Sequence, residues 1–220
     1  MNIEPVAYFH SPLKDKFGIP RQSGLAPALQ GEVRFVPPYD APEAVRGLEG
    51  FDYCWLIWGF SLNPAESAHL TVRPPRLGGN ERVGVFASRS PFRPNPLGLS
   101  CVKIESVEAG ILKVSGADLA DGTPVYDVKP YVEYADSRAG VRSGFVDSAS
   151  WKPLEVVIPE EIRAQMPSAD YKALVEILSQ DPRPAYQDDS GRVYGLLFGG
   201  FDVKFYVQDG KLFVRSAEKY

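Results

Sequence analysis

The sequence predicts a mostly β protein, an antiparallel barrel or sandwich followed by a small α+β domain. Short apolar runs alternate with turn signals from the start of the chain to about residue 135, a spacing typical of antiparallel barrels and sandwiches. The 20 glycines and 20 prolines among 220 residues exceed average usage and favour turns and short strands over long helices. From about residue 160 the apolar spacing becomes helical.

The first part of the chain contains seven runs that we expect to be strands, at residues 6–9, 32–36, 53–60, 83–87, 99–107, 111–117 and 125–132. Their connections carry Pro-Pro, Gly-Gly, Asp-Gly and Asn-Pro turn signals. The run YCWLIWGF at 53–60 has the length of a buried strand. The piece at 41–50 is too short for more than one or two helical turns.

The second part begins after a polar stretch at 136–150, which we interpret as a loop or linker. Helical spacing over 160–180 places five apolar residues on one face, and Pro167 is expected to split the segment. Those five are Ile162, Met166, Leu174, Ile177 and Leu178. Strands are expected at 193–197, 201–207 and 211–216. We therefore divide the chain into a barrel domain, 1–140, and an α+β domain, 150–220, which is small enough to need support from the barrel.

Composition excludes several classes of protein. The hydrophobic and charged contents, 44% and 24%, are ordinary for a globular domain. Cys54 and Cys101 lie in apolar runs and read best as buried free thiols of a cytoplasmic protein, although a disulfide between them stays open. His10 and His69 cannot build a histidine metal cage, so we expect no metal. We expect neither a signal peptide nor a membrane-spanning run.

Residues 71–100 form a basic, conformationally restricted segment. Five arginines stand there against a single glutamate, a local charge of +4 in a chain of net charge −4. Neighbouring prolines and glycines restrict the backbone, so these guanidinium groups lose little entropy on binding. A cluster of charges is more often a solvated surface, but the density of constraints favours a site for phosphate, carboxylate or nucleic acid. The five are Arg73, Arg76, Arg82, Arg89 and Arg93.

Motifs of common nucleotide and hydrolase sites are absent from the sequence. No GxGxxG follows a strand, and neither GxxxxGK[ST] nor GxSxG occurs. Three weaker signals remain. Pro20-Arg21-Gln22 joins a rigid backbone to a guanidinium and an amide. Asn95 lies between two prolines, and its amide can pair with the edge of adenine or merely cap a turn.

The third signal is a turn followed by an alternating strand. The string DGTP at 121–124 is typical of a β-turn, and YDVKPY follows it at 126–131. Strict alternation would place Val125, Asp127 and Lys129 on one face of that strand. Asp127 and Lys129 would then form a structural ion pair, which we favour, or a polar wall of a site.

Five strings in order resemble the TrmO (TsaA-like) family of tRNA methyltransferases. They are PRQ at 20–22, VRPPRLGGN at 72–80, SRSPFRPNPLGLS at 88–100, DGTPVYDVKPY at 121–131 and DPRPAY at 181–186. The resemblance implies an antiparallel β-barrel that binds S-adenosylmethionine without a Rossmann fold. It also implies methylation of N6 of threonylcarbamoyladenosine beside the tRNA anticodon, at position 37, by a homodimer.

The resemblance assigns roles to residues of this chain. The methyl-donor contacts would be Pro20, Arg21, Gln22, Ser61, Leu62, Arg89, Leu99, Asp121, Gly122, Thr123 and Pro124. Many relatives have a His-Gln pair where this chain has Ser61-Leu62, so only backbone contacts would survive there. Arg89 or Arg21 would pair with the donor's carboxylate.

The positions of other residues in these strings suggest which of them contact the methyl acceptor. We expect Asp127, Tyr126 and Asn95 to orient the acceptor, and Arg73, Arg76, Arg82, Arg93 and Lys129 to contact tRNA. The arginine-bearing turns should meet the DGTP bend at one mouth of the barrel. Two rival functions stay open: an RNA- or nucleotide-binding barrel without catalysis, and a methyltransferase that acts on a small molecule.

Overall fold

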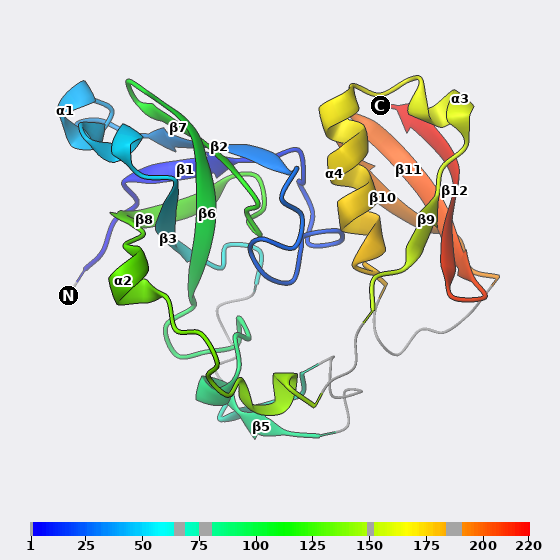
Figure 1. Ribbon diagram of the computed structural model, residues 1–220, viewed down its shortest axis with the longest axis horizontal. Coiled ribbons are helices and arrows are strands. Elements are labelled where there is room, and N and C mark those ends of the chain that lie inside the picture. The colour runs from blue at the N-terminus through cyan, green and yellow to red at the C-terminus, as the bar shows by residue number, and fades with distance from the viewer. Residues whose placement is uncertain (1, 64–68, 75–80, 149–151, 184–190) are drawn as a thin grey trace.

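The computed structural model describes residues 2–63, 69–74, 81–148, 152–183 and 191–220. Its first lobe is a closed antiparallel barrel (Figure 1) with strand order β1-β2-β7-β6-β3-β8. The strands are β1 Ala7–His10, β2 Gln30–Phe35, β3 Tyr53–Gly59, β6 Leu97–Glu108, β7 Ile111–Ser115 and β8 Thr123–Pro130. Of the two architectures that the sequence left open, the barrel is the one present, and the predicted fold class is confirmed.

Alternation along the strands builds the core of the barrel. In β3, Cys54, Leu56 and Trp58 are buried, whereas Trp55 and Ile57 between them are less so. The register pairs Leu56 with Ser100 of β6 and with Val128 of β8, so these side chains share the inner face. Gly116, with φ of +76°, ends β7 two residues before the predicted end at 117, because this conformation favours glycine and breaks the strand.

The predicted strand at 83–87 is only partly correct. β5 covers Val83–Gly84 and pairs with β4, Thr71–Val72, in a separate two-stranded arm below the barrel in Figure 1. The chain then turns into a 3-10 helix, η3, Val85–Ala87. The backbone N–H and hydroxyl of Ser88 both donate to the carbonyl of Val85, at 3.2 and 2.9 Å. This local turn replaces the strand that apolar residues alone had suggested.

The segments that connect the barrel strands, or follow the last of them, contain short helices. Residues 41–50 contain α1, Pro42–Val45, and the 3-10 helix η1, Leu48–Gly50, as expected from their length. After β8 come α2, Glu133–Asp136, and η4, Gly144–Val146. The described part of 136–148 is otherwise turns and coil.

The second lobe is a four-stranded sheet with a helix on one face (Figure 1). Its strands are β9 Glu155–Val157, β10 Tyr194–Phe198, β11 Phe201–Gln208 and β12 Lys211–Lys219. The sequence missed β9, a three-residue strand that pairs with β12 in parallel. The helices are α3 Glu160–Arg163 and α4 Ser168–Ser179, so the split at Pro167 is confirmed, and all five residues predicted for the apolar face are buried.

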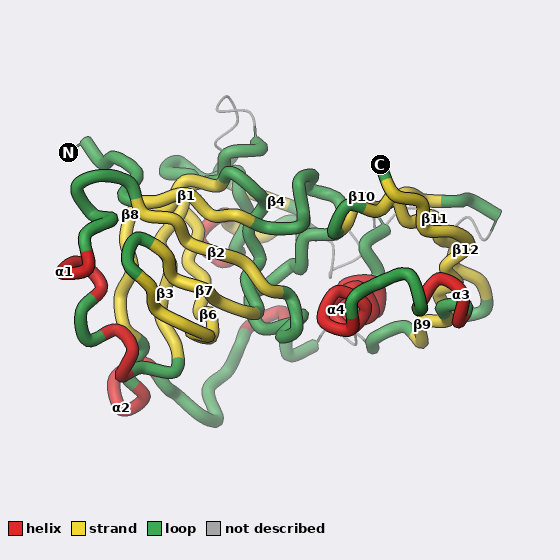
Figure 2. Tube along the Cα trace, turned by 90° about the horizontal axis from the view of Figure 1, so that it is seen from above, coloured by secondary structure: helices red, strands yellow, loops and turns green. Residues whose placement is uncertain are grey.

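A segment from the first lobe completes the core of the second. Residues 11–29 leave the barrel after β1 and reach the sheet and α4 (Figure 2), where Leu13, Ala26 and Leu29 join its buried cluster. Phe17 stacks on Tyr194 and Phe205, with ring centroids 6.4 and 6.2 Å apart. The expected support from the barrel therefore comes through one long connection that both lobes share.

The two cysteines are free, although they lie on neighbouring strands. Cys54 is fully buried inside the barrel, whereas Cys101 pairs with Trp55 and is only partly buried. Because the side chains of β3 and β6 alternate, the two sulfurs point to opposite faces of the sheet and cannot be joined. The expectation of two buried thiols is thus correct for Cys54 alone. No helix in the described ranges is long and apolar enough to cross a membrane.

Candidate active site

Residues from two of the five strings, together with Ser61, meet in one hollow at the end of β3, which we call the β3-end hollow. Ser61, Asn95, Pro124 and Tyr126 all line it, and its volume is about 510 Å³. The remaining lining residues are Ile3, Gly59, Phe60, Pro96 and Leu97. This mixture of apolar walls and a few polar groups is usual for small-molecule sites of this size.

Gly59 makes room for the ring of Tyr126. A Cβ atom on Gly59 would lie 2.9 Å from both the Cε2 atom and the hydroxyl oxygen of Tyr126, closer than such atoms approach each other. The ring therefore packs directly on the backbone at the end of β3. This contact holds the Tyr126 side chain at the edge of the β3-end hollow.

A β-bulge changes the faces of β8 from those predicted. Asp127 pairs with Ile57, but Val125 pairs with Trp58, so Tyr126 is the extra residue of the bulge. Val125 is consequently buried in the barrel core, against which the partly buried Val128 packs, and the prediction that Val125 shares a face with Asp127 and Lys129 is wrong. Strict alternation cannot anticipate an inserted residue.

Asp127 and Lys129 form the ion pair that the sequence favoured. Lys129 Nζ lies 2.8 Å from Asp127 Oδ2, and both side chains are substantially exposed. Asp127 does not line the β3-end hollow, whereas its neighbour Tyr126 does. Of the three residues expected to orient an acceptor, Tyr126 and Asn95 line the hollow and Asp127 does not.

Two predicted donor-binding residues that are far apart in sequence are in direct contact. The guanidinium of Arg89 donates a short hydrogen bond to Oε1 of Gln22. Arg21 instead points toward the second lobe, where its Nη2 donates to the carbonyl of Asp181 at 3.3 Å. Pro20 is buried at the start of this turn. The PRQ motif thus connects the barrel, the 88–93 loop and the second lobe.

A polar network that the sequence did not reveal lies beside Arg89. Ser100 donates a short hydrogen bond to Oδ1 of Asp118, and Trp58 Nε1 donates to the Ser100 hydroxyl at 2.9 Å. Burial raises the pKa of Asp118, against hydrogen bonds from Ser100 and the backbone and the attraction of Arg89. Its only sequence signal was a charged residue within the otherwise small and apolar run GADLA.

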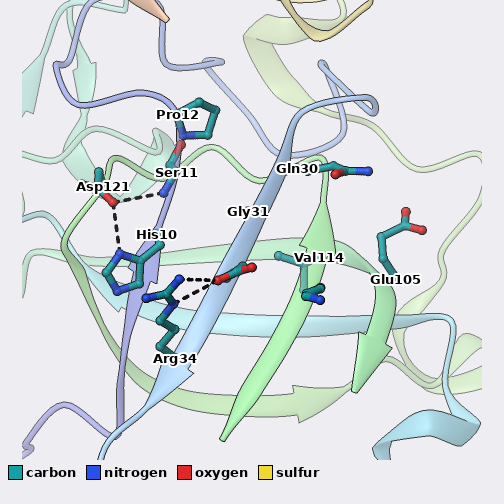
Figure 3. Close-up of a pocket in the computed structure, with 11 residues that line it drawn as sticks. His10, Ser11, Pro12, Gln30, Gly31, Arg34, Glu105, Val114 and Asp121 are labelled. Atoms are coloured by element: carbon teal, nitrogen blue, oxygen red, sulfur yellow. Dashed lines mark hydrogen bonds and ion pairs between the residues drawn. The ribbon is translucent and has the colours of Figure 1, made fainter. Parts of the chain in front are cut away.

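A second hollow of about 500 Å³, the β1–β2 hollow, lies on the barrel wall (Figure 3). Asp121 is its only predicted site residue. The Asp121 carboxylate accepts the Ser11 backbone N–H at 3.1 Å and lies 3.4 Å from His10 Nδ1. On the same wall, Arg34 and Glu32 form an ion pair at 2.8 Å. These charges are satisfied within the barrel wall.

The remaining residues of the DGTP motif form the turn into β8. Gly122 has φ of +75° and donates its N–H to the carbonyl of Phe9 at 2.8 Å, and Thr123 is buried. Of the other predicted donor contacts, Leu62 and Leu99 are exposed, at 40% and 57%. The structure does not bring Leu62 or Leu99 into either hollow.

The arginines of the basic segment are less concentrated than expected. Arg73 and Arg82 are exposed on the β4–β5 arm, where Arg82 donates to the Thr71 hydroxyl at 3.1 Å, and Arg76 lies outside the described residues. Arg93 donates to the carbonyls of Ser88 and Ser90 at 3.1 and 3.3 Å and so ties its own loop. Among the described arginines of this segment, none lines either hollow, so their expected meeting beside the DGTP bend is not seen there.

Carboxylates and histidines do not gather into a metal site in the described part of the chain, where no group of three or more His, Cys, Asp or Glu residues is suitably placed.

Both parts of the chain match models of known protein families. A family model described as the tRNA-methyltransferase O N-terminal domain matches residues 8–137, and one described as the TrmO C-terminal domain matches residues 151–220. The chain belongs to the tRNA-methyltransferase O family. The resemblance inferred from the five strings is therefore confirmed.

Individual members of the tRNA-methyltransferase O family agree with this result. The chain is 40% identical to a tRNA (adenine(37)-N6)-methyltransferase of Escherichia coli K12, over 98% of this chain and 97% of that protein. It is 43% identical to a Pseudomonas aeruginosa protein provisionally named an S-adenosylmethionine-dependent methyltransferase, over 93% and 92% of the two chains. A crystal structure of TrmO from P. aeruginosa superposes with a TM-score of 0.81 at 35% identity, covering 100% of this chain and 97% of that one.

Proposed function

We propose that this chain transfers a methyl group from S-adenosylmethionine to N6 of N6-threonylcarbamoyladenosine at position 37 of tRNA. The observation that carries the proposal is the family match, which covers both lobes in order. The geometry supports it, because the β3-end hollow gathers residues from separate family motifs at one place on the barrel.

The residues present fit a sulfonium methyl donor. Tyr126 presents an aromatic ring at the edge of the β3-end hollow, which suits a cationic sulfur. Arg89, held by Gln22, offers a guanidinium fork for a carboxylate. Ser61 and Pro124 line the same hollow. When bound, the donor supplies an activated methyl group on a good, neutral leaving group.

The acceptor is positioned by Tyr126 and Asn95. Both line the β3-end hollow, and the Asn95 amide can donate to and accept from the edge of a purine. In the transfer, a carbon–nitrogen bond forms as the carbon–sulfur bond breaks, and the acceptor nitrogen loses its proton to solvent. The carbamoyl group makes that nitrogen more acidic than a free adenine amine. The protein therefore needs accurate positioning more than a strong base.

Tyr126 is the better candidate than Asp127 for orienting the acceptor, because Asp127 is engaged by Lys129. In single-turnover assays we expect Tyr126→Phe to slow transfer and Asp127→Asn to leave it nearly unchanged. A large loss in Asp127→Asn with normal activity in Tyr126→Phe would reverse the assignment.

The decisive experiment uses a labelled methyl donor and tRNA with or without the threonylcarbamoyl group, followed by digestion to nucleosides. We expect label in the modified adenosine only. Binding of tRNA without transfer would instead indicate a non-catalytic RNA-binding barrel. Transfer to small molecules but not to tRNA would indicate a different acceptor.

We further propose that the protein acts as a homodimer in the cytoplasm, with residues 1–140 as the catalytic domain and 150–220 as an accessory domain. Leu70 and Phe86 on the β4–β5 arm are 91% and 79% exposed, and apolar groups this exposed favour association. Light scattering should give the dimer mass, and Leu70→Asp should shift it toward the monomer. A monomer at micromolar concentration would contradict the proposed assembly.

A further inference from the structure

The Asp118 side chain has no role in the chemistry proposed above, and the fold places its carboxyl group where burial disfavours the charged form. It lies in the segment between β7 and the DGTP turn, and its neighbours Ala117 and Leu119 are buried. Although the residue as a whole is partly exposed, the surroundings of its carboxyl group are dry enough to raise its pKa. A charged group retained at such a place calls for an explanation in its contacts.

The direction of the hydrogen bonds is determined by chemistry. Trp58 Nε1–H can only donate, so the Ser100 hydroxyl accepts from it at 2.9 Å. The Ser100 proton is then available for Asp118, whose Oδ1 accepts it. Ser100 is 1% exposed, so water cannot replace this contact. Strands β3 and β6 thus fix the position of the Asp118 carboxylate from inside the barrel.

On its other side, the same carboxylate meets the two motifs assigned to donor binding. The backbone of Ser23, the residue next to Gln22, and the guanidinium of Arg89 both favour the charged form of the Asp118 carboxylate and so lower its pKa against the effect of burial. Arg89 in turn donates to the Gln22 side chain. The Gly24 N–H donates to the carbonyl of Gly116 at 2.8 Å and secures the same loop two residues before Asp118.

We propose that Asp118 is a positioning residue that holds Gln22 and Arg89 in the arrangement needed to bind the methyl donor. The inference rests on the proposed function, because that function gives Gln22 and Arg89 their role. Asp118 acts through those two residues and does not itself touch the donor. Ser100 and Trp58 orient it from inside the barrel.

The cost of burying Asp118 separates positioning from ordinary structural support. Because folding raises the pKa of this carboxyl, its ionised form destabilises the folded state relative to the unfolded state above its ordinary pKa. Asp118→Asn removes the charge and keeps an oxygen that can accept from Ser100. A positioning role therefore predicts weaker donor binding without loss of thermal stability.

The test compares wild type, Asp118→Asn and a matched control by calorimetric titration with S-adenosylmethionine, steady-state kinetics and thermal unfolding. We expect the donor Kd and KM of Asp118→Asn to rise about tenfold, with kcat at saturating donor changed less than about threefold and no fall in Tm. Glu105→Gln is the control: its carboxylate also accepts a serine hydroxyl, that of Ser115 at 2.6 Å, away from Gln22 and Arg89. It should match wild type in donor Kd, KM and kcat.

Two outcomes would overturn the inference: a donor Kd within twofold of wild type, or a Tm that falls together with binding and kcat. A double-mutant cycle adds an independent check. If Asp118 acts through Arg89, adding Asp118→Asn to Arg89→Gln should weaken donor binding no further, whereas full additivity would reject the coupling. Should Asp118→Asn not fold, Ser100→Ala serves instead, and it should weaken donor binding about threefold.

The results also separate the inference from the proposed function. If wild type binds the donor but transfers no methyl group to tRNA, the proposed function fails, while the effect of Asp118→Asn on the donor Kd still supports the positioning role. If wild type methylates tRNA and Asp118→Asn binds the donor normally, the inference fails and the function stands.

Discussion

Close packing at the β3-end hollow restricts which residue can occupy individual positions. Gly59 has no side chain because Tyr126 occupies the space where a Cβ would lie, 2.9 Å from that position. Inside the barrel, Cys54 occupies a fully apolar position. Burial raises the pKa of the Cys54 thiol to about 12, with a smaller contribution from Cys101. Both residues lead to specific predictions.

Gly59→Ala should lower methyl transfer by about 10- to 100-fold, because the added methyl group displaces the Tyr126 ring from the β3-end hollow. Single-turnover rates with saturating donor and tRNA would measure the effect, and circular dichroism would show that the barrel persists. Gly50→Ala is a suitable control, since nothing lies within 4 Å of a Cβ there. Wild-type rates in Gly59→Ala would show that the Tyr126 position does not matter.

The Cys54 thiol should resist alkylation in the folded protein at pH 8, and the partly buried Cys101 should react first. The folded-state pKa is raised from 9.0 to about 12, so the unfolded thiol ionises first as the pH rises. The free energy of unfolding should therefore fall between pH 9 and 12 more steeply than in Cys54→Val, by up to about 1.4 kcal/mol per pH unit. Parallel pH profiles of the two proteins would contradict this.

Secondary-structure elements determine which charges face solvent. The β4–β5 arm carries Arg73 and Arg82 in exposed positions, whereas the Arg93 guanidinium is used to brace the 88–93 loop. Arg93 also lies 6.0 Å from the exposed ring of Phe86. The described part of the arm therefore offers the guanidinium groups of Arg73 and Arg82 to an anionic partner, although the net charge of the chain is −4.

Arg73→Ala and Arg82→Ala should each weaken tRNA binding and reduce the slope of log K against log salt by about 0.7–0.9 per lost phosphate contact. Filter binding between 50 and 200 mM salt would measure this. Arg46→Ala, which removes an exposed arginine beside α1, is the control. A loss of methyl transfer with unchanged affinity and salt slope would reject a phosphate-binding role for the arm.

At the scale of the whole molecule, the packing of the second lobe depends on the segment 11–29 that connects it to the barrel. Residues 11–29 contribute Leu13, Ala26 and Leu29 to the core of the second lobe, and Ala28 N–H donates to Glu176 of α4 at 2.7 Å. Gly18 packs so closely on Leu196 that a Cβ there would lie 2.2 Å from it. The second lobe is thus not a self-contained unit in its packing.

An isolated fragment of residues 150–220 should fail to form a fixed core, because it lacks the side chains that residues 11–29 supply. Its amide NMR spectrum should show poor dispersion. In the full chain, Phe17→Ala should lower Tm. Because Phe17 is only partly buried, the loss of stability should be smaller than the roughly 3–5 kcal/mol typical of a fully buried aromatic. A well-dispersed fragment spectrum would show that the second lobe folds without the barrel.

What the sequence determined by itself is local or motif-based. Apolar runs and turn residues are sufficient to place most barrel strands, and Pro167 splits the helical segment, because these features depend on neighbouring residues alone. The five ordered strings were also sufficient to identify the family and, with it, the barrel.

Only the tertiary structure decided how distant segments combine. Barrel closure required a bulge at Tyr126, which put Val125 rather than Asp127 inside. Gln22 meets Arg89 across 67 residues of chain, and Asp118 lies against both of their loops. The core of the second lobe borrows residues 11–29. Each of these arrangements depends on which surfaces come together in the folded protein. The periodicity of apolar residues along the chain does not specify those contacts.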